Sequence, residues 1–214
     1  MKVSVIILTS GQRNRYPYIE KLLASLSNQT FKGFELILAT ERIDEDLTNI
    51  FRRYFCLCED HRILVTGYWN KCKTANKAIM EARGDVIVLL EDDLILDQNF
   101  LDQIVKPFRI DSNIGCVYSR CIWTYREGLV NKRNIVGSLA RLLSMLSVHR
   151  SVLSKQVRVL SNHLLEVPVF TMSVACKKEA LYKAKLYDES VEEPILGEDY
   201  DLAFRIRKLG FKIV

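Results

Sequence analysis

The chain has 214 residues, of which 49% are hydrophobic and 27% are charged, with only 9 glycines and 4 prolines. This composition is typical of one globular domain and excludes collagen, low-complexity sequence and long disorder. No apolar run approaches the ~20 residues of a membrane-spanning helix, and the apolar start is too short for a signal peptide. We therefore expect a cytoplasmic protein, peripheral at the cytoplasmic face of a membrane at most.

The net charge of +5 is unevenly distributed. Residues 128–165 contain no Asp or Glu and carry a charge of +6, which leaves the rest of the chain at −1, that is +5 less +6. Within this stretch, residues 134–165 combine basic and apolar side chains in a pattern that predicts helices. The sequence leaves three interpretations of residues 134–165 open: a packed helical subdomain, a lid over the donor, or a contact with a membrane surface. The charge pattern favours a local anionic partner and no nucleic acid.

Strand-like and helical segments alternate along residues 1–119. Alternation of this kind predicts an α/β fold with a mainly parallel sheet flanked by helices. Gly84 is expected to close the third helix in a left-handed conformation, and Asp44 is expected to cap the second. The predicted strands are Lys2–Leu8, Phe34–Ala39, Arg62–Thr66, Asp85–Leu90 and Ile114–Ser119, and the predicted helices are Tyr16–Asn28, Asp44–Tyr54, Asn70–Arg83 and Asp97–Phe108.

The pattern is less regular after residue 119. The elements expected there are a strand at Val167–Ala175, helices at Lys177–Ala184 and Glu198–Leu209, and the start of a strand at Phe211–Val214. Gly210 would close the last helix. Because the chain stops where a strand starts, we interpret its C-terminus as truncated. Without repeats or a clear linker, we expect a single domain over residues 1–214.

The six cysteines form no CxxC pair, and no motif surrounds the three histidines. In a cytoplasmic chain such thiols are expected to be reduced and buried, and the pattern predicts no zinc site.

Ligands in open α/β sheets bind beyond the carboxyl ends of the strands, so the residues that follow each strand are the candidates for a site. Glu91, Asp92 and Asp93 follow a buried strand. Three adjacent carboxylates repel one another and stay ionised in solvent or beside a cation, and oxygen ligands suit Mg²⁺ or Mn²⁺. The alternative interpretation is a solvated acidic loop.

A second acidic pair, Glu198 and Asp199, lies at the expected start of a helix. The helix dipole alone favours acidic residues there, and the functional alternative is that Asp199 acts as a general base. Thr9 and Ser10 follow the first strand, where they could contact a nucleotide. The chain lacks GxGxxG, GxxxxGK[ST] and GxSxG, so it has no dinucleotide fingerprint, P-loop or nucleophile elbow.

Several segments, taken in chain order, are similar to motifs of the family 2 glycosyltransferases. They are VSVIILTS (Val3–Ser10), LLASLSNQTF (Leu22–Phe31), NKAIMEARGDVIVLLEDD (Asn76–Asp93), LYDES (Leu186–Ser190) and GEDYDLAFRIRKLGFKI (Gly197–Ile213). The resemblance extends over almost the whole chain. It implies the GT-A fold, with a nucleotide-sugar-binding half in residues 1–119 and an acceptor-side half in residues 120–214.

The resemblance also implies a reaction and a set of roles. The reaction is inverting transfer of a sugar from a UDP- or GDP-sugar to a hydroxyl acceptor, which is a glycan, a lipid-linked molecule or a small molecule. It uses Mn²⁺ or Mg²⁺. The implied roles are catalytic base for Asp199, acceptor positioning for Glu198, metal ligation for Asp93 and Glu91, and nucleotide-sugar binding for Thr9, Ser10, Glu41, Asn76 and Asp92.

Two positions depart from the family pattern. Thr40-Glu41 replaces the usual Asp-Asp after the second strand, which puts the common uridine recognition in doubt, and Glu91 replaces the first Asp of the DxD motif. Two other functions stay open. A sugar-phosphate nucleotidyltransferase shares the sheet and the metal, although its Gly-rich start and Pro-Lys are missing here. A non-catalytic sugar-nucleotide-binding or scaffold protein is the other alternative.

Overall fold

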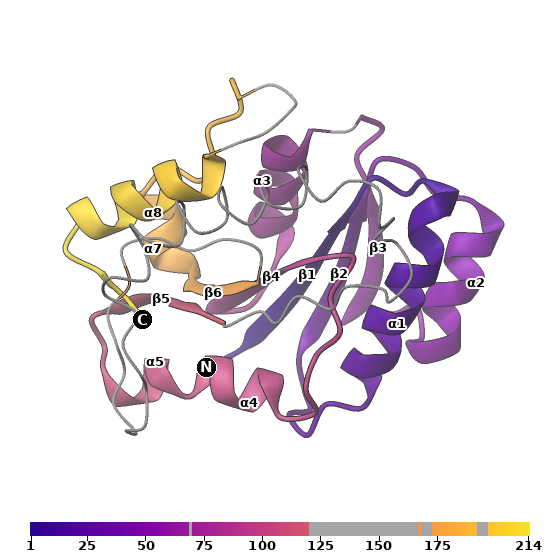
Figure 1. The fold of residues 1–214 in the computed structure, drawn as a ribbon, viewed down its shortest axis with the longest axis horizontal. Coiled ribbons are helices and arrows are strands. Elements are labelled where there is room, and N and C mark those ends of the chain that lie inside the picture. The colour runs from indigo at the N-terminus through magenta and orange to yellow at the C-terminus, as the bar shows by residue number, and fades with distance from the viewer. Residues whose placement is uncertain (69, 120–166, 168–172, 192–196) are drawn as a thin grey trace, which may run out of the picture. The chain divides into compact units, whose positions relative to one another are not determined.

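The computed structural model describes residues 1–68, 70–119, 167, 173–191 and 197–214 (Figure 1). The described elements lie in one compact unit, made of residues 1–120 and 165–214. The basic segment predicted at 134–165 lies outside the described residues, as does most of the strand predicted at Val167–Ala175.

Within the described residues, seven strands form one sheet in the order β3-β2-β1-β4-β6-β5-β7. The first four strands of this order are parallel to one another, β6 is antiparallel to both of its neighbours, and β7 is parallel to β5. The predicted mainly parallel α/β sheet is therefore confirmed, with β6 as its antiparallel member. The strands are β1 (Val3–Thr9), β2 (Glu35–Thr40), β3 (His61–Val65), β4 (Val86–Glu91), β5 (Ile114–Tyr118), β6 (Val174–Lys177) and β7 (Lys212–Ile213).

Helices cover both faces of the sheet (Figure 1). Successive side chains of a strand point to opposite faces, so in β1 Val5 and Ile7 pack on one face and Ile6 and Leu8 on the other. The first face is covered by α1 (Tyr16–Ser27), α2 (Glu45–Tyr54), α4 (Phe100–Val105) and α5 (Pro107–Ile110), and the second by α3 (Lys71–Glu81), α7 (Lys178–Lys183) and α8 (Glu198–Lys208). Two buried cores, one on each face, hold the sheet in place.

Local signals explain where several of the helices begin and end. Asp44 caps α2 as predicted, because its Oδ1 accepts the N–H of Leu47 at 2.9 Å. Gly210 has a φ of 88° after α8, as expected for a left-handed helix end. The single helix predicted at Asp97–Phe108 is wrong, since α4 and α5 divide there. Pro107 has no N–H to continue the helix, and it starts the second piece instead.

The prediction that Gly84 is a left-handed helix cap is also wrong. α3 is followed by Ala82 in an extended conformation, and φ of Gly84 is not positive. The N–H of Gly84 donates to Oγ of Ser4 at 2.8 Å, and a Cβ at position 84 would lie 2.5 Å from the backbone nitrogen of Ser4. A glycine is needed because the chain passes this close to β1.

We therefore expect Gly84→Ala to lower the free energy of unfolding by about 1–3 kcal/mol or more, since an added methyl group meets backbone that cannot yield. The matched control is Gly67→Ala, where φ is +78° but a Cβ meets nothing within 4 Å. This control carries only the left-handed strain of roughly 1 kcal/mol. Urea unfolding measures both variants, and equal losses would contradict the steric explanation.

The cysteines differ from the expectation of reduced, buried thiols. Cys116 and Cys176 form a disulfide, because the register of β5 and β6 places them directly opposite each other. Cys56 and Cys58 are free but exposed, Cys72 is free and buried as predicted, and Cys121 lies outside the described residues. The expectation is thus wrong for the disulfide pair and for the two exposed thiols.

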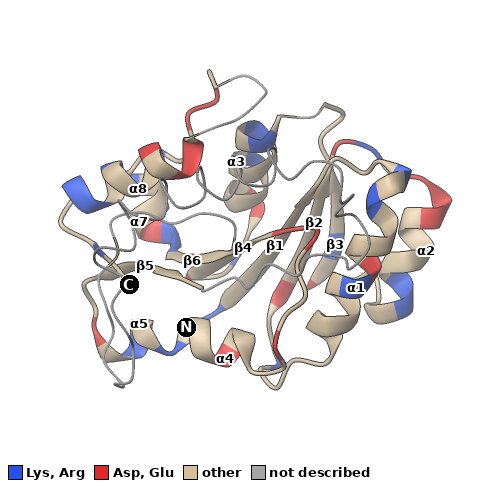
Figure 2. Cartoon of the chain, in the orientation of Figure 1, with Lys and Arg blue, Asp and Glu red and all other residues tan. Residues whose placement is uncertain are grey.

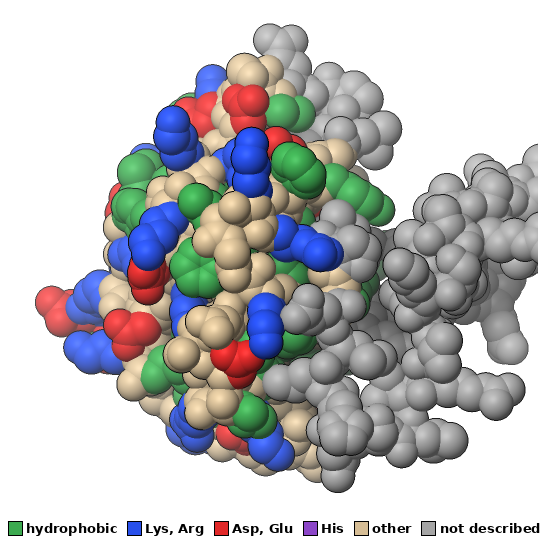
Figure 3. Space-filling view, turned by 90° about the vertical axis from the view of Figure 1, so that its left-hand side faces the viewer, with side chains coloured by type: hydrophobic (Ala, Val, Ile, Leu, Met, Phe, Trp, Pro, Cys, Tyr) green, Lys and Arg blue, Asp and Glu red, His purple; other side chains and the backbone are tan. Residues whose placement is uncertain are grey.

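The surface of the described residues mixes charges of both signs. Figure 3 shows the face that lies to the left in Figure 1, where basic, acidic and apolar side chains are interspersed. Of the helices that the structure describes, none has the length and apolar character needed to cross a membrane.

Candidate functional site

Most of the candidate residues lie at the carboxyl edge of the four parallel strands. β1 ends at Thr9 and β4 ends at Glu91, and the register of the sheet aligns Leu8 with Glu91. α3 begins at Lys71 after β3, and α8 begins at Glu198. This is the edge at which open α/β sheets bind ligands. The tertiary structure therefore brings together acidic residues that are about 100 residues apart in the chain.

Asp92 is held by two side chains from the start of the chain. Oγ1 of Thr9 donates to its carboxylate at 2.5 Å, and Nε of Arg15 donates to it at 3.0 Å. The guanidinium of Arg15 also forms an ion pair with Asp93 at 3.2 Å. The side chain of Asp92 is 6% exposed, whereas that of Asp93 is 45% exposed. The side chain of Asp92 is thus fixed and buried, and that of Asp93 is accessible to a ligand.

Lys71 connects three carboxylates from two elements. Its Nζ lies 2.8 Å from Oε1 of Glu91, 2.8 Å from Oε1 of Glu198 and 3.9 Å from Oδ2 of Asp199. Burial by itself lowers the pKa of Lys71, but the charges of Asp199 and Glu91 and the hydrogen bonds to Glu198 and Glu91 raise it above its ordinary value overall. The ammonium group therefore stays charged at neutral pH and compensates part of the negative charge.

Asp199 has the properties of a general base. Its side chain is 10% exposed and accepts a hydrogen bond from the Tyr187 hydroxyl at 3.1 Å. Burial raises the pKa of Asp199 to about 6, against the opposing effect of the Lys71 charge. Burial and the neighbouring Asp199 also raise the pKa of Tyr187, so its hydroxyl remains a donor. A carboxyl group with a pKa this close to neutral pH is suited to proton transfer.

The helix dipole is the alternative explanation for the acidic residues at the start of α8. Gly197 precedes the helix with a φ of 98°, and the first turn contains Glu198, Asp199 and Asp201. Figure 2 shows acidic residues at this end of α8 and basic residues at the other. The dipole stabilises all three carboxylates, but the dipole does not account for the burial of Asp199.

The other predicted residues lie in different surroundings. Ser10 is half-buried beside Thr9, and Glu41 forms an ion pair with Arg42 at 2.6 Å. Asn76 is buried, where its Nδ2 donates to the carbonyl of Tyr187 and its Oδ1 accepts that residue's N–H, both at 2.9 Å. Asn76 thus holds the turn at Tyr187, and its contact with the donor stays a prediction from the sequence.

The sequence reasoning missed Lys71, Arg15 and Tyr187. One signal was available for Lys71, because a lysine at the first position of a helix is opposed by the helix dipole and so needs nearby anions. The pairing of Lys71 with Glu198 spans 127 residues. Nothing in the local pattern around Arg15 indicates Asp92, 77 residues away, as its partner, and nothing around Tyr187 indicates Asp199.

The carboxylate oxygens at this edge are of the chemical class that binds a hard divalent cation. Five carboxylates and two basic groups lie at this edge, and their net charge is −3 when all are ionised. They are Glu91, Asp92, Asp93, Glu198 and Asp199, with Lys71 and Arg15. Carboxylate oxygens are the ligands that Mg²⁺ and Mn²⁺ prefer. Glu91 is bonded to Lys71 and Asp92 to Thr9, and Asp93 is paired with Arg15. At 45% exposure, Asp93 is the most accessible of the three to an ion.

Sequence comparison identifies the family. The model of the family described as "Glycosyltransferase like family 2" matches residues 2–214. The chain is 23% identical over 220 residues to the glycosyltransferase GlyA of Streptococcus pneumoniae serotype 4, with 100% of this chain and 29% of GlyA covered. It is 30% identical over 129 residues to protein CgeD of Bacillus subtilis, with 56% and 29% covered. The chain thus spans less than a third of the length of these relatives.

Structural comparison agrees with this result. A mannosyltransferase of Pyrobaculum calidifontis, in complex with GDP-Man and Mn²⁺, has a TM-score of 0.67 and 20% identity, with 100% of this chain and 54% of that chain covered. S. aureus TarS in complex with UDP also has a TM-score of 0.67, at 15% identity, with 100% and 58% covered. The chain belongs to glycosyltransferase family 2, and its mixed seven-stranded sheet has the GT-A fold.

Proposed function

We propose that the chain is the catalytic domain of an inverting, metal-dependent glycosyltransferase. The observation that carries the proposal is Asp199, a buried carboxylate with a pKa of about 6 that lies within the acidic edge of the sheet. The similar structures that were determined with GDP-Man, UDP and UDP-GlcNAc support a nucleotide sugar as the donor. The acceptor carries a hydroxyl group.

The reaction is a single displacement. The acceptor hydroxyl gives its proton to a carboxylate oxygen of Asp199, while its oxygen forms a bond to the anomeric carbon of the donor. The bond from that carbon to the diphosphate breaks, and its electron pair leaves with the nucleoside diphosphate. Because attack and departure occur on opposite faces, the anomeric configuration inverts. Glu198, adjacent to the base, positions the acceptor.

The remaining residues hold the donor. Thr9, Ser10 and Glu41 follow the first two strands and contact the nucleotide, and Asp92 lies near its ribose. Asp93 holds a divalent cation, Mn²⁺ or Mg²⁺, with Glu91 as the second ligand expected from the sequence. The ion supplies positive charge to the diphosphate. Contact of residues 134–165 with a membrane or a lipid-linked acceptor stays a prediction from the sequence.

The proposal is tested by donor hydrolysis. We expect the protein to release nucleoside diphosphate slowly from one nucleotide sugar of a panel when Mn²⁺ is present, and to stop when EDTA is added. Asp93→Ala should lower the release by about 100-fold or more, since a metal ion supplies several kcal/mol of charge stabilisation. The matched control is Asp46→Ala, an exposed aspartate on α2, which should keep full activity.

Two outcomes would contradict the proposal. Absence of release together with absence of metal-dependent nucleotide binding in calorimetry would indicate a non-catalytic scaffold. Release of pyrophosphate from a nucleoside triphosphate and a sugar phosphate would indicate a nucleotidyltransferase.

A further inference from the structure

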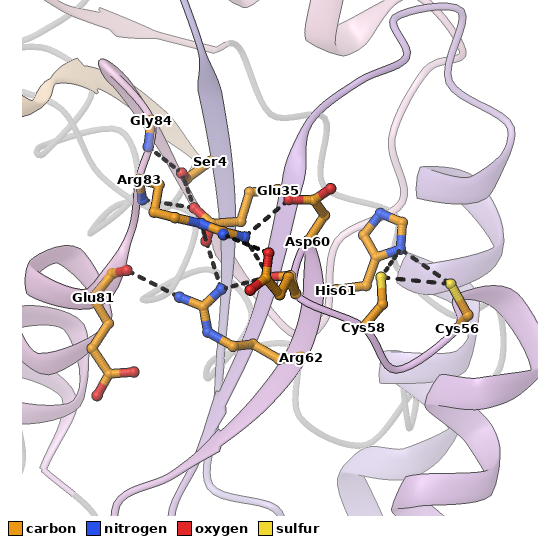
Figure 4. A network of polar contacts seen from close by, with 11 residues as sticks. Ser4, Glu35, Cys56, Cys58, Asp60, His61, Arg62, Glu81, Arg83 and Gly84 are labelled. Carbon is orange, nitrogen blue, oxygen red and sulfur yellow. Dashed lines mark hydrogen bonds and ion pairs between the residues drawn. The ribbon is translucent and has the colours of Figure 1, made fainter.

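A second cluster of reactive side chains lies at the amino edge of the same sheet, where β3 starts (Figure 4). It consists of Cys56 and Cys58, from the loop between α2 and β3, and His61, the first residue of β3. Sγ of Cys56 lies 3.7 Å from Sγ of Cys58, and Nδ1 of His61 lies 3.8 Å from the first sulfur and 3.9 Å from the second. The three atoms form a nearly equilateral triangle.

This triangle has the size of one face of a tetrahedral zinc site. With a Zn–S distance of about 2.3 Å and a Zn–N distance of about 2.0–2.1 Å, tetrahedral angles place two sulfurs about 3.8 Å apart and a sulfur and a nitrogen about 3.6 Å apart. The observed separations agree within a few tenths of an ångström. Each ligand can therefore bind a common ion without a change in the backbone.

The exposure of the thiols is unusual for cysteines that only fill space. Free cysteines are among the most buried residues, yet both Cys56 and Cys58 are exposed, and His61 is half-buried. The ring of His61 packs edge-on against that of Phe55, with centroids 5.2 Å apart, which fixes the plane of the imidazole. Among the described residues, this is the one group of three or more His, Cys, Asp or Glu whose ligand atoms all lie within 4.8 Å of one another.

The loop that carries the ligands is held in shape by its own backbone. The N–H of Cys58 donates to the carbonyl of His61 at 2.9 Å, and the N–H of His61 donates to the carbonyl of Cys58 at 3.2 Å. The N–H of Leu36 in β2 donates to the carbonyl of Asp60 at 2.6 Å. Two of the three ligands are therefore in position without a metal.

A polar network around the buried carboxylate of Glu35 attaches this loop to the core (Figure 4). The side chain of Glu35 is 6% exposed and accepts hydrogen bonds from Arg62 and Arg83. Both arginines also donate to the carbonyl of Glu59, and Arg83 contacts the carboxylate of Asp60 at 2.9 Å. Burial raises the pKa of Glu35, but its hydrogen bonds outweigh this effect and lower it overall. The network restricts the loop, so less entropy is lost when an ion binds.

We propose that Cys56, Cys58 and His61 bind a zinc ion that fastens the end of α2 to the edge strand β3. Two thiolates and an imidazole select Zn²⁺ over Mg²⁺, Ca²⁺ or Mn²⁺, which prefer oxygen. Three protein ligands leave the fourth position to water. The absence of a CxxC pair led to the prediction that the chain has no zinc site. The proposed site differs from that prediction because its ligands have the spacing Cys-x-Cys-x-x-His.

This site is independent of the proposed sugar transfer. It lies at the amino edge of the sheet, whereas the acidic residues lie at the carboxyl edge, and its sulfur ligands take a different class of ion. Zinc binding at this position is therefore expected to change stability and thiol reactivity, and to leave Mn²⁺-dependent donor hydrolysis unaffected.

The first test is a cobalt titration of the metal-free full chain in a phosphine reductant. We expect one Co²⁺ per chain, with a thiolate-to-cobalt charge-transfer band in the near ultraviolet and visible bands typical of tetrahedral cobalt, and displacement of both by Zn²⁺. The bands should be lost in the double variant Cys56→Ser/Cys58→Ser and weakened in His61→Gln. They should persist in Cys72→Ala, the matched control for a thiol elsewhere in the chain. Bands that survive in the double variant, or that are absent in the unmodified protein, would overturn the proposal.

A second measurement needs no variant and so does not depend on their folding. Zn²⁺ should protect Cys56 and Cys58 from alkylation, as mapped by mass spectrometry of the peptides, and should raise the Tm of the unmodified chain. Equal alkylation with and without Zn²⁺ would overturn the proposal. So would a disulfide between Cys56 and Cys58 that persists under the reductant and binds no metal.

Discussion

Replacing Asp199 by asparagine is expected to lower kcat by about 10²–10⁴-fold, the usual contribution of a general base, and to leave the Kd of the donor nearly unchanged. Asparagine has the same size and can still accept the hydrogen bond from Tyr187, but it cannot take a proton from the acceptor. Donor binding is measured by calorimetry and transfer by release of nucleoside diphosphate. Equal losses of binding and turnover would assign Asp199 to the donor site instead.

The same residue predicts the acid limb of the pH profile. The base acts only when ionised, so the rate of the unmodified enzyme should fall as the pH decreases through about 6, the pKa of Asp199. The effect on stability has the opposite sign. Because folding raises this pKa, the stabilising contribution is present at low pH and is lost as the pH rises through about 6. Asp199→Asn should therefore raise the free energy of unfolding at pH 8, by on the order of 2–3 kcal/mol, and not at pH 4.

Asp201→Asn is the matched control, since it makes the same change two residues further along α8. Asp201 is half-exposed and pairs with Arg205 at 2.6 Å on the helix surface, an interaction worth about 0.3–0.5 kcal/mol. The Asp201→Asn variant should therefore have the activity and the pH profile of the unmodified protein. If Asp201→Asn lost turnover as Asp199→Asn does, the charge of the helix start would be responsible, and the role of Asp199 as base would be refuted.

Lys71→Met is expected to destabilise the fold and to move the acid limb of kcat/KM to higher pH. Removal of the ammonium group leaves Glu91, Glu198 and Asp199 without their shared cation, and the charge that holds down the pKa of Asp199 is lost. Breaking a buried ion pair costs about 3–5 kcal/mol, and the partial exposure of Lys71 reduces this to about 2–3 kcal/mol. Urea unfolding at pH 7.5 and a pH series of donor turnover measure the two effects.

The control for this prediction is Lys73→Met, an exposed lysine in the first turn of the same helix. It carries the same change in charge and hydrophobicity, and it should leave the unfolding midpoint and the pH profile in place. An unchanged acid limb in Lys71→Met, in a protein that folds, would show that Lys71 does not set the ionisation of Asp199.

Much of the architecture was predictable because its signals are local. Short apolar runs such as that of β4 indicate strands, helical spacing of apolar residues indicates α1, and Asp44 caps α2 through a neighbour three residues away. The acidic residues of the site were also predictable, because Glu91 to Asp93 directly follow a strand. Pro107 and Gly84 were misjudged, the first because its break in the helix was overlooked and the second because its close neighbour, Ser4, is 80 residues away.

The sequence by itself determined the α/β class, the family resemblance and the acidic residues at the strand ends, since each depends on residues that lie near one another in the chain. Only the tertiary structure decided the partners of those residues. Lys71 meets Glu198, Arg15 meets Asp92 and Cys116 meets Cys176 because strands, helices and loops that are distant in the chain pack against one another. The triangle of Cys56, Cys58 and His61 depends on the turn that brings the end of α2 to the start of β3. Periodicity describes which face a residue occupies, and packing alone determines what lies opposite.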